Sequence, residues 1–208
     1  MNDERQKFLV ATGNAGKVRE FRDMLGPLRF QWVGLGDFSP IDPVEETGDT
    51  FRANANLKAT AYARATGLWT LADDSGLEVD ALDKKPGIFS ARWAQMHNAG
   101  SGDHANNSLL LRQLDQIPAE HRTARFVCVL AIADPRGTVV WTTRATMEGR
   151  IVRTPVGSNG FGYDPLFEVA GLGITSAELP PAEKHRISHR GRALDRLKPL
   201  LDRFEGWV

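Results

Sequence analysis

Apolar residues in the first third of the chain alternate between short continuous runs and helical spacing. Phe8 to Ala11 is an apolar run of strand length, whereas Val18, Phe21 and Leu25 are spaced for one face of a helix. Gly26-Pro27 and Gly67 are typical of helix ends. The pattern predicts, in order, a strand at 8–11, a helix at 17–25, a strand at 30–33, a helix at 50–66 and a strand at 68–72. This βαβαβ order indicates an α/β domain.

The second half of the chain adds antiparallel features. Residues 97–107 are rich in Gly, Asn and Ser, which favours a mobile loop, and Asp134-Pro135-Arg136-Gly137 suits a type I turn. The further predicted elements are a helix with Leu110, Leu114 and Ile117 on one face, strands at 126–133, 138–144 and 146–152, and a last helix with Leu194, Leu197, Leu201 and Phe204. Pro199 lies inside the last pattern and predicts a kink or a break there. The predicted fold class is therefore mixed α/β.

The composition fits one soluble domain and excludes several functional classes. The 208 residues carry 26 Lys plus Arg and 26 Asp plus Glu, so the net charge is zero and gives no basic excess for binding nucleic acid. The longest apolar run, at 126–133, is too short to span a membrane, and the residues after Met1 do not suit a secretion signal. Cys128 is the only cysteine, which excludes an internal disulfide and a multi-cysteine metal site. We expect a single domain over residues 1–208, located in the cytoplasm.

The turn Thr12-Gly13-Asn14-Ala15-Gly16-Lys17 lies between the first predicted strand and the first predicted helix. Small residues let the backbone approach an anion, the helix N-terminus offers N–H groups, and Lys17 adds a positive charge. The pattern is neither a Walker A loop nor a GxGxxG fingerprint. It is compatible with a phosphate-binding turn and, equally, with an ordinary tight turn beside a solvated lysine.

Two acidic clusters have the residue types of a magnesium site. Glu45-Glu46-Thr47-Gly48 precedes the second helix, and Asp73-Asp74-Ser75-Gly76 follows the strand at 68–72. Mg²⁺ prefers carboxylate, water and phosphate oxygens. Neighbouring side chains in a strand point to opposite faces, so only one of Asp73 and Asp74 is expected to face a metal. A helix cap or a solvated turn is the alternative, and it is the favoured one for Glu45-Glu46 alone.

Two later segments have the residue types of nucleotide recognition. The loop at 157–165 combines glycines with Phe161 and Tyr163, and an aromatic ring on such a loop can stack on a base. Lys184 and Ser188-His189-Arg190-Gly191 supply donors for carbonyl or phosphate oxygens. The structural alternatives are a loop with core aromatics and a solvated helix entry.

Other candidate residues give weaker signals. Arg92 is a further candidate anion contact, whereas Lys58, on the second helix, is expected to be an exposed helical lysine. Cys128 lies in an apolar run and is expected to be a buried small hydrophobe. The histidines in the middle of the chain lack metal-ligand spacing and are expected on the surface or in loops: His97, His104 and His121.

Taken in this order, the motifs resemble those of the inosine triphosphate pyrophosphatase family, also called the Ham1-like or deaminated-purine nucleoside triphosphate pyrophosphatases. The matching segments are Thr-Gly-Asn-Ala-Gly-Lys (12–17), Glu-Glu-Thr-Gly (45–48), Ala-Asp-Asp-Ser-Gly-Leu (72–77), Pro-Gly-Ile-Phe-Ser-Ala-Arg (86–92), Phe-Gly-Tyr-Asp-Pro (161–165) and Ser-His-Arg-Gly (188–191). The resemblance covers nearly the whole chain, and six motifs with full-domain spacing make it specific.

The resemblance implies an elongated, two-lobed mixed α/β fold with the active site in the cleft between the lobes, and a homodimer. It implies a Mg²⁺-dependent hydrolase that converts ITP, dITP and XTP to the monophosphate and pyrophosphate. The implied role is to cleanse the nucleotide pool, so that hypoxanthine and xanthine stay out of DNA and RNA. Neither nucleic acid nor a membrane is an implied partner.

Carried over motif by motif, the resemblance implies that Glu45 and Asp74 bind the metal and that Asp74 accepts a proton from the attacking water. A carboxylate bound to Mg²⁺ is a poor base. Asp74 could therefore orient a metal-bound water and not accept its proton, and Asp73 could share the task of orienting that water. The implied substrate-binding residues are Thr12, Gly13, Asn14, Ala15, Gly16, Lys17, Ser75, Phe161, Gly162, Tyr163, Asp164, Lys184, His189 and Arg190.

Three rival functions are weighed against this one. A Nudix hydrolase fails because Ile41-Asp42 stand where its motif needs Arg-Glu before Glu-Glu-x-Gly. A Maf-like nucleotide pyrophosphatase, which prefers pyrimidine or modified substrates, is the runner-up, and a panel of nucleotides separates the two. A nucleotide-binding module without catalysis is disfavoured, because carboxylates repel phosphates unless a metal intervenes.

Overall fold

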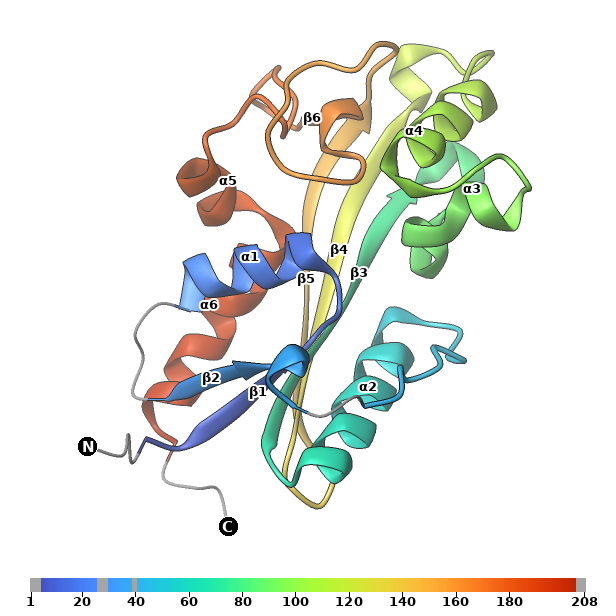
Figure 1. Cartoon of the computed structure of the whole chain (residues 1–208). Helices are drawn as coiled ribbons and strands as arrows, with labels where there is room; N and C mark the ends of the chain where they lie inside the picture. Colours follow the sequence, from blue (N-terminus) through green and yellow to red (C-terminus); the bar gives the residue numbers. More distant parts are fainter. Residues whose placement is uncertain (1–4, 26–29, 39–40, 205–208) are drawn as a thin grey trace. The chain divides into compact units, whose positions relative to one another are not determined.

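The computed structural model describes residues 5–25, 30–38 and 41–204 (Figure 1). The strands are β1 (Lys7–Ala11), β2 (Gln31–Gly34), β3 (Trp69–Val79), β4 (Thr123–Ala133), β5 (Val139–Ile151) and β6 (Phe167–Val169). The α-helices are α1 (Ala15–Leu25), α2 (Phe51–Thr66), α3 (Trp93–Met96), α4 (Gly102–Gln113), α5 (Pro181–Ile187) and α6 (His189–Asp202). Short 3₁₀ helices are η1 (Leu35–Asp37), η2 (Asp80–Leu82), η3 (Gly87–Arg92), η4 (Ala119–His121) and η5 (Asp164–Leu166). The predicted mixed α/β class is confirmed.

The strands form one mixed sheet in the order β2-β1-β3-β4-β5-β6. β1 pairs in parallel with both β2 and β3, and Leu9 lies opposite Val33 on one side and Thr70 on the other. β5 and β6 pair in antiparallel fashion. The parallel pairs follow from the helical connections α1 and α2, because a crossover helix is the usual link between parallel strands.

The chain divides into two compact units. The first comprises the residues up to 74, residues 128–144 and the residues from 193 onward, and the second comprises 75–127 and 145–192. The division falls inside β3, between Asp74 and Ser75. Within the described residues, no helix has the length and apolar character needed to cross a membrane.

An aromatic cluster forms part of the core of the first unit. The ring of Phe8 in β1 lies 4.9 Å from that of Phe30 and 5.3 Å from that of Phe204, which follows α6. Trp69, the first residue of β3, lies 5.0 Å from Phe204 in an edge-on arrangement. Aromatic pairs prefer this geometry, so the cluster holds the end of α6 against β1 and β3. Figure 1 shows α1 and α6 on one side of β1 and β2, with α2 on the other.

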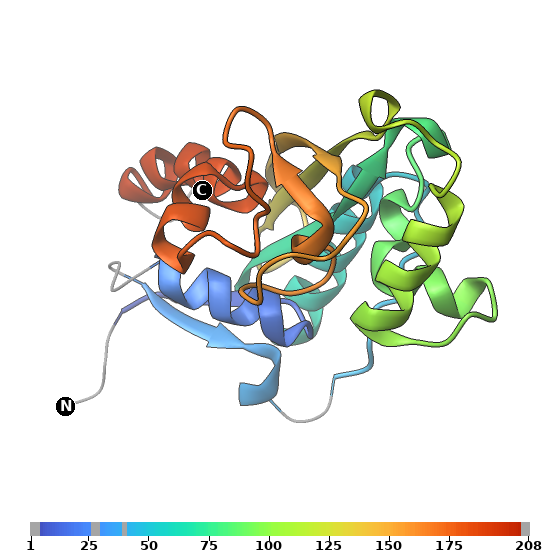
Figure 2. The same cartoon turned by 90° about the horizontal axis from the view of Figure 1, so that it is seen from above.

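The core of the second unit joins strands, α4 and the loop that leads to β6. Buried Leu77, Leu110, Phe126 and Phe167 are members of one apolar cluster. Tyr163 belongs to the same cluster, with 4% of its surface exposed. The loop at 157–165 is therefore anchored in the core through an aromatic residue of its own. Figure 2 shows the backbone from above.

The boundaries of α2 follow its sequence signals. Thr50 caps the helix, because its hydroxyl accepts a hydrogen bond from the N–H of Ala53 at 3.1 Å. Gly67 ends it in the left-handed conformation at φ 67°, which glycine adopts without steric cost. The predicted helix at 50–66 is confirmed, whereas Gly26-Pro27, the predicted end of the first helix, lies outside the described residues.

Two predicted boundaries, the end of a strand and the extent of a loop, are wrong. In both places, polar side chains are buried and paired. The strand predicted at 68–72 continues to Val79, so Asp73 and Asp74 lie inside β3 and not after it. Residues 97–107 do not form one mobile loop, because α4 begins at Gly102. The amide of Asn106 accepts from the N–H of Ala94 and donates to the carbonyl of Ala91, which ties α4 to the segment before it.

Two further differences concern the end of the chain. The strands predicted at 138–144 and 146–152 are one continuous strand, β5, which follows a turn closed by the hydrogen bond from Gly137 N–H to Asp134 C=O. α6 continues through Pro199 to Asp202, so the predicted break is absent. Leu197 and Leu201 on either side of Pro199 are buried, and this packing compensates for the single helical hydrogen bond that proline removes.

Candidate active site

The turn at 12–17 leads into α1, and a side chain caps the N–H group of Lys17 in the first turn of this helix. The carboxamide oxygen of Asn14 accepts from the N–H of Lys17 at 3.0 Å, and the hydroxyl of Thr12 accepts from the N–H of Asn14 at 3.3 Å. Gly13 is exposed, with no atom near the position of a Cβ. This is the open, donor-rich helix N-terminus that an anion requires.

A buried charge cluster surrounds the acidic pair of β3. The ammonium group of Lys17 lies 2.5 Å from Oδ1 of Asp73, and that of Lys58 lies 2.8 Å from Oδ1 of Asp74. Lys58 also donates to Oε1 of Glu46 at 2.7 Å. Asp73 and Asp74 therefore pair with lysines from different helices, α1 and α2, as the alternation of side chains along a strand requires.

Burial raises the pKa of Asp74, and this effect outweighs the charges of Lys58 and Lys17, which lower it. Burial also acts to lower the pKa of Lys58, but the charges of Asp74 and Asp73 prevail and raise it. Lys58 is therefore firmly protonated. Asp74 carries its charge at a cost, because the carboxylate is buried.

The chemistry of this cluster fits an added cation. Three carboxylates, those of Glu46, Asp73 and Asp74, face two ammonium groups, which leaves one negative charge in excess. Oδ2 of Asp74 is buried and accepts no hydrogen bond from the described residues. Oxygen ligands with excess negative charge are what Mg²⁺ requires. The described residues contain no group of three or more His, Cys, Asp or Glu side chains with metal-binding geometry.

The structure brings Glu46, and not the predicted metal ligand Glu45, to Lys58 and Asp74. Glu45 is exposed on the same segment. Its assignment as a ligand stays a prediction. The segment is held by Asn54, whose side-chain oxygen accepts from the N–H of Gly48 at 2.8 Å.

The second unit assembles the predicted recognition residues around Phe161. The guanidinium carbon of Arg190 lies 6.0 Å from the centre of the Phe161 ring, and the ammonium nitrogen of Lys184 lies 5.4 Å from it. Arg190 also donates to the hydroxyl of Ser75 at 2.8 Å. Lys184 and Arg190 are 4% and 1% exposed, so the predicted alternative of a solvated helix entry is wrong.

Asp164 is the structural centre of this loop. Its carboxylate accepts from the ammonium group of Lys184 at 2.6 Å, from the N–H of Phe161 at 2.9 Å and from the hydroxyl of Ser176 at 2.7 Å. A Cβ on Gly160, whose φ is 81°, would lie 2.0 Å from the same carboxylate. The glycine is required there, and Asp164 acts by shaping the loop around Phe161.

Phe161 and Tyr163 differ in their availability to a base. Phe161 is half-buried, whereas Tyr163 is buried and donates its hydroxyl to the carbonyl of Ser90 at 2.9 Å. The ring of His189 stacks on that of Phe126 at 5.0 Å. Of the two predicted stacking partners, Phe161 is therefore the one with an accessible ring.

The remaining sequence candidates lie as follows. Lys58 is buried, so its predicted exposure is wrong. Cys128 is buried as predicted, with its thiol 3.4 Å from the carboxylate of Asp73. Arg92 stacks over the ring of Phe89 at 5.4 Å. The three histidines predicted on the surface are exposed: His97, His104 and His121.

Sequence reasoning missed Lys58 and Glu46 as members of the cluster. The signal for Lys58 is its position, because it follows Asn54 by one helical turn within the buried stripe of Phe51, Ala55 and Ala59. A polar residue at a position where the helix buries its face requires a partner. Glu46 carries no comparable signal, because its neighbour Glu45 is of the same type.

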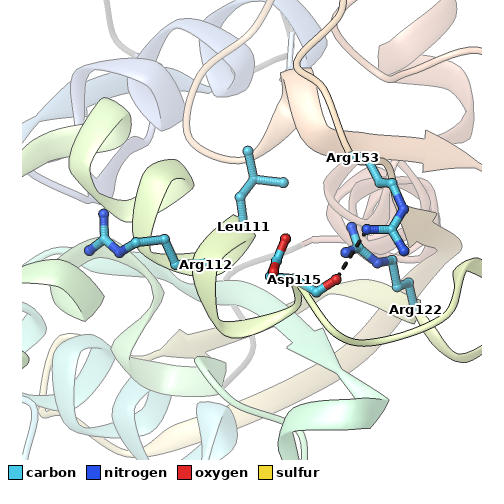
Figure 3. A pocket seen from close by; sticks show the side chains of 5 residues that line it. All are labelled: Leu111, Arg112, Asp115, Arg122 and Arg153. Atoms are coloured by element: carbon cyan, nitrogen blue, oxygen red, sulfur yellow. Dashed lines mark hydrogen bonds between the residues drawn. The ribbon is translucent and has the colours of Figure 1, made fainter.

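A cavity of about 480 Å³ in the second unit contains none of the predicted site residues. It is lined by Leu111, Arg112, Asp115, Arg122 and Arg153 (Figure 3). Arg153 donates to the backbone carbonyls of Asp115 and Ile117, and the guanidinium group of Arg122 donates to those of Ile117 and Leu114. These arginines bind carbonyls at and just after the C-terminal end of α4, a structural role.

The chain is similar to a family of known proteins along nearly its whole length. A sequence profile of the Ham1 family matches residues 8–200. A protein of Exiguobacterium sibiricum named dITP/XTP pyrophosphatase is 52% identical over 200 residues, which cover 96% of this chain and 99% of that protein. A protein of the same name from Geobacter sulfurreducens is 48% identical over 201 residues, which cover 97% of each chain.

Solved structures show the same similarity. A HAM1 protein from Coxiella burnetii matches with a TM-score of 0.85 and 38% identity, covering 96% of this chain and all of that one. The Ham1 protein of Staphylococcus aureus matches with a TM-score of 0.82 and 39% identity, covering 95% of this chain and 98% of that one.

Proposed function

Because the chain belongs to the Ham1 family, we propose that it hydrolyses the deaminated purine nucleotides ITP, dITP and XTP to the monophosphate and pyrophosphate. The activity named for its relatives is that of a dITP/XTP pyrophosphatase. The observation that carries the proposal is the pairing of buried Asp73 and Asp74 with half-buried Lys17 and buried Lys58 beside the N-terminus of α1. The role is to keep hypoxanthine and xanthine nucleotides out of the precursor pool.

The triphosphate binds at the turn of residues 12–17. It carries about four negative charges, which the N–H groups at the start of α1 and the ammonium group of Lys17 offset. Lys17 is already fixed by Asp73 at 2.5 Å, so little side-chain freedom is lost when the phosphates bind. This positions the scissile phosphorus for attack.

Asp74 orients the attacking water and, with Glu45, holds Mg²⁺. The support is the buried Oδ2 of Asp74, which has no hydrogen-bond partner among the described residues, and the excess negative charge of the cluster. Mg²⁺, when bound, supplies charge neutralisation and makes water more acidic. Lys58 donates to the other oxygen of the Asp74 carboxylate, Oδ1, and so fixes its orientation. Glu46, which shares Lys58, is a third carboxylate available to the same cation.

The base is recognised in the second unit. The half-buried Phe161 offers a ring for stacking, and Arg190 and His189 supply donors for the 6-oxygen that hypoxanthine and xanthine share. Adenine carries an amino group at that position, so a donor of the base would face a donor of the protein. Such a mismatch costs about 1–3 kcal/mol. Arg190 also donates to the hydroxyl of Ser75, the residue that follows Asp74 in the chain.

Four further properties belong to the same proposal. The family profile covers residues of both units, which supports a single functional domain over residues 1–208. A homodimer, a cytoplasmic location and the absence of nucleic acid or membrane partners are drawn from the family resemblance and the neutral composition.

A nucleotide panel tests the proposal against its rivals. We would measure kcat/KM for ITP, XTP, GTP, ATP and UTP with Mg²⁺, and repeat the ITP assay with a chelator and then with excess Mg²⁺. The proposal predicts activity on ITP and XTP, loss with the chelator and recovery with Mg²⁺. A preference for UTP would favour a Maf-like enzyme, and binding of ITP without turnover would favour a nucleotide-binding module.

A further inference from the structure

Helix α4 holds the loop of Phe161 through a single residue, Gly162. The carboxylate of Asp103 accepts from the N–H of Gly162 at 2.6 Å. The carboxamide of Asn107 donates to the carbonyl of Gly162 at 3.0 Å. Both backbone groups of one loop residue are therefore bound by side chains of one helix, and Figures 1 and 2 both show α4 next to this loop.

The two helix residues are spaced to do this together. Asp103 and Asn107 are four residues apart in α4, so they lie on the same helical face. Gly162 has a φ of 63°, in the left-handed region, where a residue with a side chain would be strained. The loop thus presents its N–H and C=O to α4 in a conformation that glycine makes accessible.

The contact acts on the residue that is proposed to stack on the base. Gly162 directly follows Phe161, whose own N–H is held by Asp164. Gly162 directly precedes Tyr163, whose ring is buried in the core and whose hydroxyl is held by Ser90. Within residues 5–25, 30–38 and 41–204, Gly162 makes no other hydrogen bond, so Asp103 and Asn107 alone fix its backbone groups.

Burial of the Asn107 side-chain amide costs free energy, and packing alone does not explain why it is tolerated. Its side-chain oxygen is buried and has no hydrogen-bond partner in the part of the chain that the structure describes. An unsatisfied buried acceptor is unfavourable, and such groups persist where another requirement outweighs them. The nitrogen of the same amide donates to the carbonyl of Gly162, and this contact is the requirement that outweighs the cost.

We propose that Asp103 and Asn107 are positioning residues for substrate recognition, which fix Gly162 and so hold Phe161 in the orientation that stacks on a purine base. This inference rests on the proposed function, because it assigns the stacking role to Phe161. A recognition loop that is already ordered loses less conformational entropy when the substrate binds. The effect belongs to base binding and not to the phosphate chemistry.

The experiment compares the double variant Asp103→Ala/Asn107→Ala with His104→Ala, a matched control on the same turn of α4 whose side chain is exposed. Three kinds of measurement are made: steady-state kinetics with ITP (KM and kcat), inhibition by IMP and by pyrophosphate, and amide hydrogen exchange of residues 157–165. IMP carries the base, whereas pyrophosphate occupies only the phosphate part of the site.

In the double variant we expect KM for ITP and the inhibition constant of IMP to rise by ~10-fold, as for the loss of two hydrogen bonds. The kcat value and the inhibition constant of pyrophosphate stay unchanged. Exchange in residues 157–165 becomes faster, while residues 126–133 of β4 keep their protection. Asp103→Asn, which retains an acceptor oxygen for Gly162, is expected to restore most of the ITP affinity relative to Asp103→Ala. His104→Ala matches the wild type throughout.

Unchanged exchange in residues 157–165, or an equal loss of affinity for IMP and pyrophosphate, would overturn the inference. If the double variant does not fold, Asn107→Ala alone decides the case by the same readouts. The exchange measurement needs no substrate, so it tests the hold on Gly162 even if wild-type protein proves inactive on ITP. That inactivity would count against the proposed function alone.

Discussion

Lys58 lies with its ammonium group 2.8 Å from Oδ1 of Asp74 and 2.7 Å from Oε1 of Glu46. It is 9% exposed and reaches both carboxylates from α2. One lysine thus keeps two acidic side chains, far apart in the sequence, in a single cluster. We therefore expect Lys58 both to stabilise the first unit and to fix the position of Asp74.

Replacement of Lys58 by methionine tests this double role. Lys58→Met keeps the length of the side chain and removes the charge, which leaves Asp74 and Glu46 close together without their cation. Breaking a buried ion pair in this way is expected to lower the free energy of unfolding at pH 7 by about 3 kcal/mol. Urea denaturation measures it, with Arg52→Met on the exposed face of the same helix as the control. An effect no larger than that of Arg52→Met would contradict the role of Lys58.

Replacement of Asp74 by asparagine separates catalysis from stability. Asp74→Asn keeps the shape of the side chain but removes the charge that orients water and binds a cation. We expect turnover of ITP to fall by at least ~10²-fold, as for loss of a general base or an equivalent group. Because burial makes the charge of Asp74 costly and the cluster has one negative charge in excess, the melting temperature should stay the same or rise. Near-normal turnover in this variant would refute the catalytic role.

The two aromatic residues of the 157–165 loop should respond differently to substitution. Phe161→Leu removes the ring that is available for stacking, and kcat/KM for ITP is expected to fall by ~10-fold, since stacking on one base contributes about 1–3 kcal/mol. Tyr163→Phe removes only the buried hydrogen bond to Ser90, which should lower the melting temperature and leave KM unchanged. Steady-state kinetics and thermal unfolding of both variants distinguish the roles. A larger KM effect in Tyr163→Phe would reverse the assignment.

Asp80 gives the second unit an acid-sensitive contribution to stability. Burial raises its pKa, but hydrogen bonds from Lys84, Thr123 and Arg125 outweigh this and hold the pKa at about 2, below the ordinary value of 3.8. The folded state therefore releases this proton more readily than the unfolded state. The resulting stability is fully present above pH 3.8 and is lost as the pH falls through about 2.

The variant Asp80→Asn removes this contribution. Its free energy of unfolding, measured by urea denaturation between pH 5 and pH 2, should depend less steeply on pH than that of the wild type. Asp195→Asn, at an exposed residue of α6 paired with Lys198, serves as the control and should keep the wild-type slope. Equal slopes for Asp80→Asn and the wild type would show that Asp80 does not act in this way.

The elements that the sequence predicted well are those with local signals. Gly67 ends α2 as predicted, because a left-handed glycine at a helix end depends only on neighbouring residues. The sequence predicts a strand that ends at Ala72, whereas β3 continues through Asp73 and Asp74 to Val79. Its continuation depends on Lys17 and Lys58, whose positions are set by tertiary packing and leave no trace in the local pattern.

The residues of the candidate site likewise divide into those with a local sequence signal and those without one. The motifs at 12–17, 72–77 and 188–191 identified residues that carry charge or donors, since those side chains are unusual in their surroundings. Asp103 and Asn107 were not identified, because Gly-, Asn- and Ser-rich sequence is typical of loops and gives no sign of the distant residue that each side chain binds. Glu46 could not be separated from Glu45 by residue type alone.

The products formed from ITP show whether the enzyme cleaves between the α- and β-phosphates. Purified protein would be incubated with ITP and Mg²⁺, and inosine products, pyrophosphate and orthophosphate would be quantified separately without added pyrophosphatase. The account predicts IMP and pyrophosphate in equal amounts, with ATP hydrolysed much more slowly under the same conditions. Release of orthophosphate with IDP, or hydrolysis of ATP at the rate of ITP, would contradict it.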